Sequence, residues 1–182
     1  MFSSRALAVA ALAATTAVAV GCTPTPGTAA IVDGEVITAS EVAVVVEELG
    51  PLLSAVNQPP SPYRPSDALA DIIFAEPVLG ATADAGLGVS AQDARATAER
   101  VANELGIEQP ELSEASLEVM RYRIITGQIA TVPNAAEIAA DIEQRVADQD
   151  ITVSPRYEIT DAGPGIAQFP WIEYPWAETA QS

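Results

Sequence analysis

Apolar residues recur every three or four positions along most of the chain, which is the spacing of one buried face of an α-helix. We expect helices from Thr38 to Val56, from Ser66 onward, and over Ser90–Leu105, Ser113–Ala130 and Asn134–Gln149. The residues expected to face the core are Val42, Val45, Val46, Leu49, Leu52, Leu53, Val56, Leu69, Ile72, Ile73, Phe74, Ala94, Ala98, Val101, Leu105, Leu117, Met120, Ile124, Ile125, Ile138, Ile142 and Val146. The pattern predicts a mainly helical chain.

Several of these helices carry signals at their ends. Thr38 and Glu41 have the spacing of a capping box, in which each side chain binds a backbone amide that the helix leaves unpaired. Asn134 and Glu137 have the same spacing, and Gly106 is suited to end a helix. These signals fix where three of the helices begin or end.

Prolines complicate two of the helical segments. Pro51 and Pro77 lie inside apolar periodic runs and lack the amide that a helix interior uses, so we expect a kink or a break at each. The segment Asn57–Ser66 contains four prolines and is expected to be an exposed, extended loop. The number of helices therefore stays open.

Two short stretches have strand character. Ile31–Ile37 predicts a hairpin, because Asp33-Gly34 suits a tight turn with positive φ angles. Ile151–Tyr157 is rich in β-favouring residues, although Pro155 limits it to an edge. A two-stranded hairpin is marginal alone, so we expect the late strand to pair with it. The predicted fold is mainly α, with a small antiparallel sheet joining the N-terminal hairpin and the C-terminal strand.

The first residues resemble an export signal. One positive charge at Arg5 precedes an uncharged run from Ala6 to Val20, which is too short to span a membrane. The sequence "AVGC", Ala19 to Cys22, resembles a bacterial lipobox, although Ala19 stands where leucine is usual. This implies that Cys22 is lipidated and anchors the chain to the outer face of the cell membrane. An ordinary secretory signal that happens to hold the only cysteine is the alternative.

Composition and charge exclude much chemistry. The 182 residues include 49% hydrophobic but 5% aromatic residues, and the net charge is -17. Such a chain repels phosphate, so nucleic acid is excluded as a partner, and membrane contact is expected through the lipid anchor only. Histidine is absent, which removes the commonest general base and metal ligand. We expect no catalytic residues, no metal and no cofactor.

The C-terminal tail concentrates aromatic residues. The stretch "FPWIEYPW" holds Phe169, Trp171, Tyr174 and Trp176, including both tryptophans of the chain. Aromatic side chains between prolines suggest either a segment that docks in the chain's own apolar groove, as a plug, or a surface that binds a partner. Both alternatives stay open.

Two other polar groups have ordinary explanations. The segment "EQPELSE", Glu108 to Glu114, holds several carboxylates, as a catalytic pair would, but acids are also favoured at a helix start. Arg121 and Arg123 beside Tyr122 are suited to bind a peptide carboxylate, yet an ordinary helix surface explains them better. We expect neither group to be a site.

The order of these elements, with the stretches "VDGEVITASEV", "AGLGVSAQDA" and "ITVSPRYEI", resembles the SurA-type chaperone domain of exported foldases over most of residues 29–160. The resemblance implies a helical domain in which a late strand pairs beside the N-terminal strand. Family members commonly carry an inserted parvulin prolyl isomerase domain. Here Ala130 and Asn134 leave no room for it, and the family's histidine pair is missing, so we expect no isomerase activity.

The chain is thereby divided into four expected parts. These are a signal peptide (1–21), a lipidated flexible linker (22–28), a SurA-like chaperone domain (29–160) and a tail rich in proline and aromatic residues (161–182).

Three functions follow as hypotheses. The first is a membrane-anchored extracytoplasmic chaperone that binds unfolded or extended exported polypeptides without catalysis, in a cradle of small apolar side chains with an acidic rim. The second is a non-catalytic cell-envelope adaptor lipoprotein that binds one dedicated partner through the aromatic tail. The third, an enzyme, is disfavoured by the depleted set of acids and bases.

Overall fold

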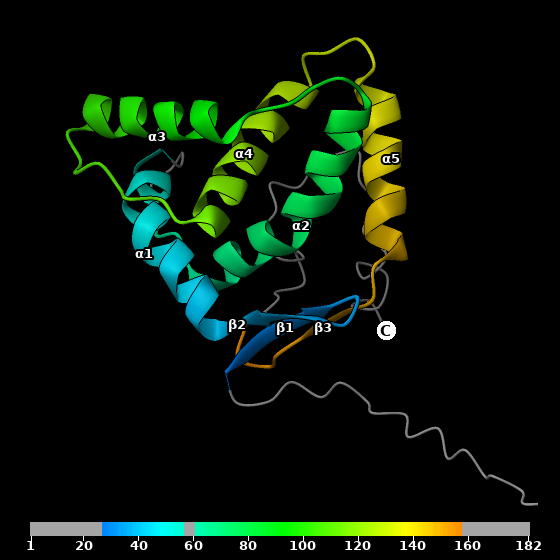
Figure 1. Ribbon diagram of the computed structural model, residues 1–182, viewed down its shortest axis with the longest axis horizontal. Coiled ribbons are helices and arrows are strands. Elements are labelled where there is room, and N and C mark those ends of the chain that lie inside the picture. The colour runs from blue at the N-terminus through cyan, green and yellow to red at the C-terminus, as the bar shows by residue number, and fades with distance from the viewer. Residues whose placement is uncertain (1–26, 57–60, 158–182) are drawn as a thin grey trace, which may run out of the picture.

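The first and last described elements of the chain lie side by side in one small sheet, and five helices lie between them in sequence (Figure 1). The computed structural model describes residues 27–56 and 61–157. The elements in this part of the chain are β1 (Thr28–Val32), β2 (Glu35–Thr38), α1 (Ala39–Val56), α2 (Pro65–Asp84), α3 (Ala91–Leu105), α4 (Glu114–Ile129), α5 (Ala135–Asp148) and β3 (Ile151–Val153). The fold is mainly α with a three-stranded antiparallel sheet, as the sequence predicted.

The predicted long-range strand pairing is confirmed. β1 is the central strand and pairs antiparallel with β2 and with β3, in the order β2-β1-β3. The register places Ile31 opposite both Val36 and Thr152. β1 begins at Thr28, three residues before the predicted start of the hairpin, and β3 ends two residues before Pro155. Because β1 lies between the other two strands, β3 pairs with β1 and not with β2.

The hairpin turn also holds the late strand in place. Asp33 and Gly34 have φ angles of 52° and 87°, which is the left-handed conformation predicted for this tight turn. The Asp33 amide donates to the carbonyl of Asp150 at 2.9 Å, and the Asp33 carboxylate accepts from the Asp150 amide at 2.8 Å. One turn residue thus joins positions 117 residues apart.

α1 begins at the capping box that the sequence predicted. The Glu41 amide donates to the Thr38 hydroxyl at 3.1 Å, and the Thr38 amide donates to the Glu41 carboxylate at 3.5 Å. Of the kink or break expected at Pro51, the break is wrong, because α1 continues through the proline to Val56. Burial of Leu52 and Leu53 after the proline offsets the single backbone hydrogen bond that proline removes.

α2 begins before its predicted start, and of the kink or break expected at Pro77 the break is wrong. It begins at Pro65, before the expected Ser66, since the first helical position needs no amide donor. The Arg64 amide instead donates to the Asp67 carboxylate at 2.9 Å. The helix also continues past Pro77, which is buried, to Asp84. The part of the proline-rich loop at 57–60 lies outside the described residues.

Two other expectations about helices are wrong in detail. α3 buries Ala94, Ala98 and Ala102, each 0% exposed, whereas Leu105 is 43% exposed. This alanine stripe packs against α4, so close helix packing decides which side of α3 is buried.

At the start of α5 the Asn134 side chain makes no capping hydrogen bond, and the Glu137 amide donates to the backbone carbonyl of Asn134 instead.

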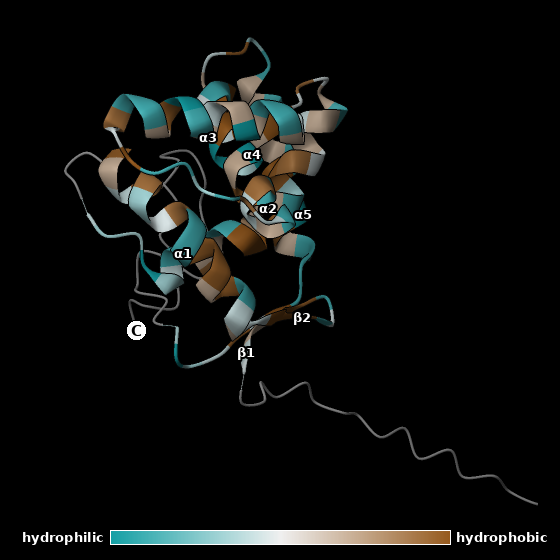
Figure 2. Ribbon diagram, turned by 60° about the vertical axis from the view of Figure 1, so that its left-hand side comes forward, coloured by the Kyte–Doolittle hydropathy of each residue, from teal (hydrophilic) through white to brown (hydrophobic). Residues whose placement is uncertain are grey.

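The core is formed where the helices cross. α2 packs against both α4 and α5, α4 also contacts α1 and α3, and β1 contacts α1 and α2. Hydrophobic positions turn toward these contacts (Figure 2). The largest apolar side chains that are fully buried are Val42, Val45, Leu49, Val119, Ile125 and Ile129. The small side chains of α3 belong to this packed core, so they do not line an open surface.

We predict that Asp33→Ala lowers the free energy of unfolding by about 1–3 kcal/mol, because it removes the carboxylate that binds Asp150 and places alanine at a positive φ. Asp33→Asn keeps an acceptor and tolerates this φ, so it should stay within about 0.5 kcal/mol of the wild type. Urea unfolding followed by circular dichroism measures both. Equal stability of the two variants would contradict the role given to the turn.

Candidate functional site

A buried ion pair joins α2 to α4. Asp71 is 1% exposed, and its Oδ2 accepts from both Nε and Nη2 of Arg123 at 2.7 Å. The Tyr63 hydroxyl donates to the same oxygen at 2.7 Å, and the Arg123 guanidinium lies 5.7 Å from the centre of the Tyr63 ring. The backbone amide of Tyr63 also donates to the Ser54 hydroxyl at 2.9 Å. The segment before α2 is thereby bound to α1, α2 and α4.

Burial governs the protonation of this cluster. Burial raises the pKa of Asp71 to about 6, against the opposing effect of Arg123 and of the Tyr63 hydroxyl. Burial and the neighbouring Asp71 carboxylate also raise the pKa of Tyr63. A raised carboxyl pKa can mark a catalytic acid, but at 1% exposure Asp71 is out of reach of a substrate. The cluster is therefore structural.

The arginines that were considered for peptide binding are engaged within the fold. Arg121 donates from Nε to the Val89 carbonyl at 2.7 Å, Arg123 binds Asp71, and Tyr122 is buried. The ordinary helix surface expected for this group is wrong for Tyr122, which is buried, while the side chain of Arg123 is 29% exposed and bound to Asp71. The sequence feature that could have indicated this buried pair is Asp71. It lies three residues after Ala68 and four before Ala75, and therefore on the buried face of α2.

A surface hollow of about 430 Å³ lies between α1 and the segment that links α3 to α4. Both of these elements lie at the left of Figure 1. Apolar and acidic residues from both sides line the hollow. The lining residues are Val44, Glu47, Glu48, Pro51, Leu52, Ile107, Glu108, Gln109, Pro110 and Glu111. Its volume lies in the range of small-molecule and side-chain binding pockets.

Glu48 ties the two sides of this hollow together. Its Oε2 accepts from the backbone amide and from the hydroxyl of Ser113, each at 2.8 Å. Burial raises the pKa of Glu48, but hydrogen bonds from Ser116 and Ser113 outweigh this effect and hold it below the ordinary value. Ser113 is the N-cap of α4, so a carboxylate of α1 contributes to the start of α4. Glu108 and Glu111 of the "EQPELSE" segment line the hollow, while Glu114 lies in the first turn of α4.

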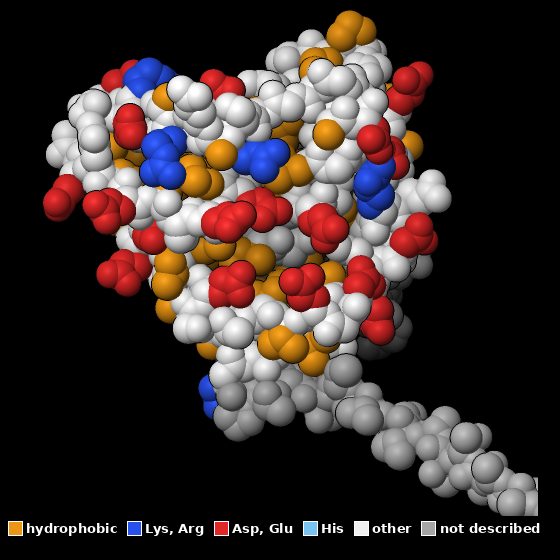
Figure 3. Space-filling view, viewed as in Figure 1, with side chains coloured by type: hydrophobic (Ala, Val, Ile, Leu, Met, Phe, Trp, Pro, Cys, Tyr) orange, Lys and Arg blue, Asp and Glu red, His pale blue; other side chains and the backbone are white. Residues whose placement is uncertain are grey.

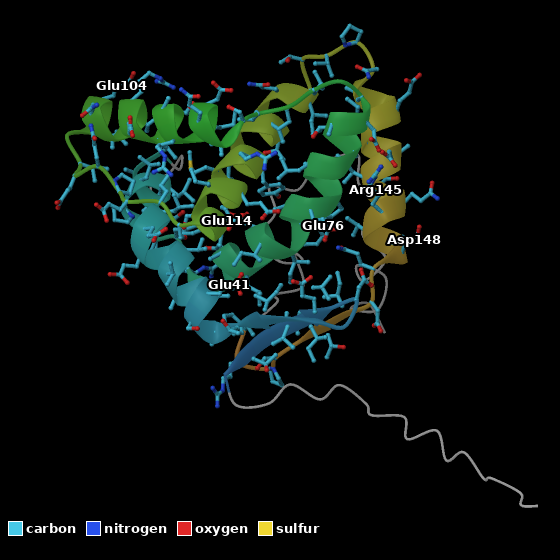
Figure 4. All side chains as sticks on the ribbon, in the orientation of Figure 1. Glu41, Glu76, Glu104, Glu114, Arg145 and Asp148 are labelled. Atoms are coloured by element: carbon cyan, nitrogen blue, oxygen red, sulfur yellow. The ribbon has the colours of Figure 1, made fainter. Side chains whose placement is uncertain are left out.

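A second acidic group lies on the face seen in Figure 3, where acidic side chains alternate with hydrophobic ones. Glu41, Glu76 and Glu114 come from α1, α2 and α4 (Figure 4). Burial raises the pKa of Glu118, Arg121 opposes this effect, and the carboxylates of Glu76, Glu114 and Glu41 add to it. In the part of the chain that the structure describes, no group of acidic or cysteine side chains has the arrangement to hold a metal ion.

The remaining predicted site residues cannot be placed. Cys22 and the aromatic residues Phe169, Trp171, Tyr174 and Trp176 lie outside the described residues. Among the described helices, none has the length and apolar character needed to cross a membrane. No family model matches the chain, and neither a curated protein nor a solved structure is similar to it. The hollow beside α1 is therefore the candidate site on geometry alone.

We predict that Arg123→Met lowers the free energy of unfolding by about 3 kcal/mol, because it leaves the Asp71 carboxylate buried without a counter-ion. Adding Asp71→Asn removes that charge and keeps an acceptor for the Tyr63 hydroxyl, so the double variant should regain at least about 1 kcal/mol. Arg100→Met, which breaks the exposed pair with Glu104, is the control and should change stability by less than about 1 kcal/mol. Urea unfolding measures all three, and a double variant less stable than Arg123→Met would contradict the assignment.

The raised pKa of Asp71 predicts a pH dependence of stability. Between its unfolded value of 3.8 and its folded value of about 6 the native state binds more protons, so this group's stabilisation is present at low pH and lost as pH rises. The stability of the wild type relative to Asp71→Asn should fall by about 2 kcal/mol between pH 4 and pH 7. Subtracting the unfolding free energy of Asp71→Asn from that of the wild type removes the pH dependence that the two proteins share, such as that of Glu48. Urea unfolding at each pH measures this difference in stability. A difference that stays constant or rises between pH 4 and pH 7 would contradict the prediction.

Proposed function

We propose that the protein is a membrane-anchored, extracytoplasmic, chaperone-like protein that binds unfolded or extended exported polypeptides without catalysis. The observation that carries the proposal is the hollow between α1 and residues 107–111, which is open at the surface and lined by Val44, Pro51 and Leu52. Apolar side chains are exposed along unfolded polypeptides and mostly buried in folded ones, so such a pocket favours unfolded chains.

The resemblance to the SurA-type chaperone domain supports the same function. The resemblance implied an early hairpin, a set of helices and a late strand returning to the hairpin. The observed order, with β3 beside β1, agrees with that expectation. This agreement concerns the order of the elements, and the binding of polypeptides is our proposal.

Anchoring through Cys22 would keep the domain close to the membrane. Only residues 23–27 separate Cys22 from β1, a reach of about 20 Å when fully extended. A net charge of -17 repels an anionic lipid surface, so the anchor rather than the domain would supply the membrane contact. Polypeptides emerging from the membrane would then meet the domain first.

One observation favours the second candidate, a cell-envelope adaptor lipoprotein with one dedicated partner. A hollow of about 430 Å³ accommodates a few side chains rather than a long polypeptide segment. Recognition of a short motif in one partner would need no larger surface. The number of different polypeptides bound therefore separates the two functions.

We predict that the purified chain delays the aggregation of several unrelated unfolded proteins, measured by light scattering at equal concentrations. Val44→Ser should weaken this protection by roughly threefold, because it removes apolar lining from the hollow. Val56→Ser is the matched control, since Val56 belongs to the same helix and is 45% exposed, against 38% for Val44.

Crosslinking in intact cells tests the same proposal on natural partners. Many different exported polypeptides should be captured by the wild type and fewer by Val44→Ser. Capture of one stoichiometric partner, with no protection against aggregation, would replace the chaperone-like function with the adaptor.

A further inference from the structure

We propose that the hollow between α1 and residues 107–111 selects basic segments of exported polypeptides by receiving an arginine or lysine side chain. The inference rests on the proposed function and specifies the class of polypeptide that is bound.

The lining matches both parts of a long basic side chain. Arginine and lysine carry an apolar stem that packs on apolar surface while the charged end stays near water or a counter-ion. Val44, Pro51 and Leu52 on one side and Ile107 and Pro110 on the other supply the apolar surface. Four glutamates also line the hollow, so a neutral apolar side chain would leave their charge without a partner.

The fold leaves these carboxylates without a cationic partner. Glu47, Glu48, Glu108 and Glu111 take part in no ion pair among residues 27–56 and 61–157. Glu48 is held by Ser113, which fixes its carboxylate at the wall. The arginines of the described ion pairs are bound to acidic residues elsewhere, namely Arg64 to Asp67, Arg100 to Glu104, Arg123 to Asp71 and Arg145 to Asp84 and Asp141.

Charge disfavours two occupants that this protein itself can offer, the C-terminal tail and a second copy of the chain. One such occupant is the tail at 158–182, docked in the chain's own hollow. The tail contains Glu158, Asp161, Glu173 and Glu178 and neither arginine nor lysine. A second copy of the chain carries a net charge of -17. Both would bring negative charge to an acidic hollow, which is repulsive. A basic segment of a different polypeptide is the occupant that charge complementarity selects.

The test uses the full chain and a fluorescent peptide with one arginine among leucine and valine residues. The comparison peptide carries citrulline, which has the shape of arginine without its charge. Anisotropy titration should give roughly fivefold tighter binding of the arginine peptide at low salt. The preference should largely disappear as ionic strength rises from about 0.01 M to about 1 M.

Variants locate the preference in the hollow. Glu47→Gln combined with Glu111→Gln should reduce the preference for arginine to less than about twofold, while Glu48 is kept because it binds Ser113. Glu137→Gln combined with Asp148→Asn makes the same change in net charge on α5 and should leave the preference intact. Thermal unfolding of each variant checks that the fold is retained.

The outcomes separate this inference from the proposed function. Equal binding of the two peptides by a chain that still protects unfolded proteins would overturn the selection of basic segments alone. Equal loss of preference in both double variants would also overturn it, because the effect would then come from net charge. Arginine-dependent binding without protection would instead overturn the chaperone-like function and leave the specificity of the hollow standing.

Discussion

The antiparallel pairing of β1 with β3 is the constraint on which the rest of the structure depends. It joins residues more than a hundred positions apart, so its formation has to offset the entropy of closing a loop that contains all five helices. Once formed, it fixes where α1 starts and where α5 ends. A hairpin of β1 and β2 alone would be marginal in water, so pairing with β3 and packing against α1 and α2 both stabilise the sheet. Helices and sheet therefore stabilise each other.

Local signals made much of this arrangement predictable. Asp33-Gly34 can form few turns other than the one observed, Thr38 and Glu41 satisfy two amides with their own side chains, and Gly106 has the positive φ that ends α3. Each of these features depends on residues close in sequence. The buried faces of α1 and α5 were largely predictable for the same reason, since the spacing of apolar residues defines them without reference to a neighbour. Val56 at the end of α1 is the exception, because it was expected to face the core and is 45% exposed.

What the sequence did not reveal depends on contacts between distant elements. Pro51 and Pro77 were expected to interrupt helices, but packing on both sides of each proline keeps α1 and α2 continuous. Asp71 lies among apolar residues because Arg123 reaches it from another helix. The position and the lining of the candidate hollow were not predicted, because α1 and residues 107–111 are brought together only by the fold. Periodicity along one helix carries no information about such partners.

The alanine stripe of α3 has a consequence for the hollow that lies beyond it. Because Ala94, Ala98 and Ala102 are completely buried, the thickness of their side chains sets how near α3 approaches α4. Residues 107–111 follow directly from the end of α3 and form one wall of the hollow. The stripe therefore works as a spacer that sets the aperture of the hollow from a distance. A change of one methyl group in this spacer would alter the fit of an occupant while every residue that touches the occupant stays the same.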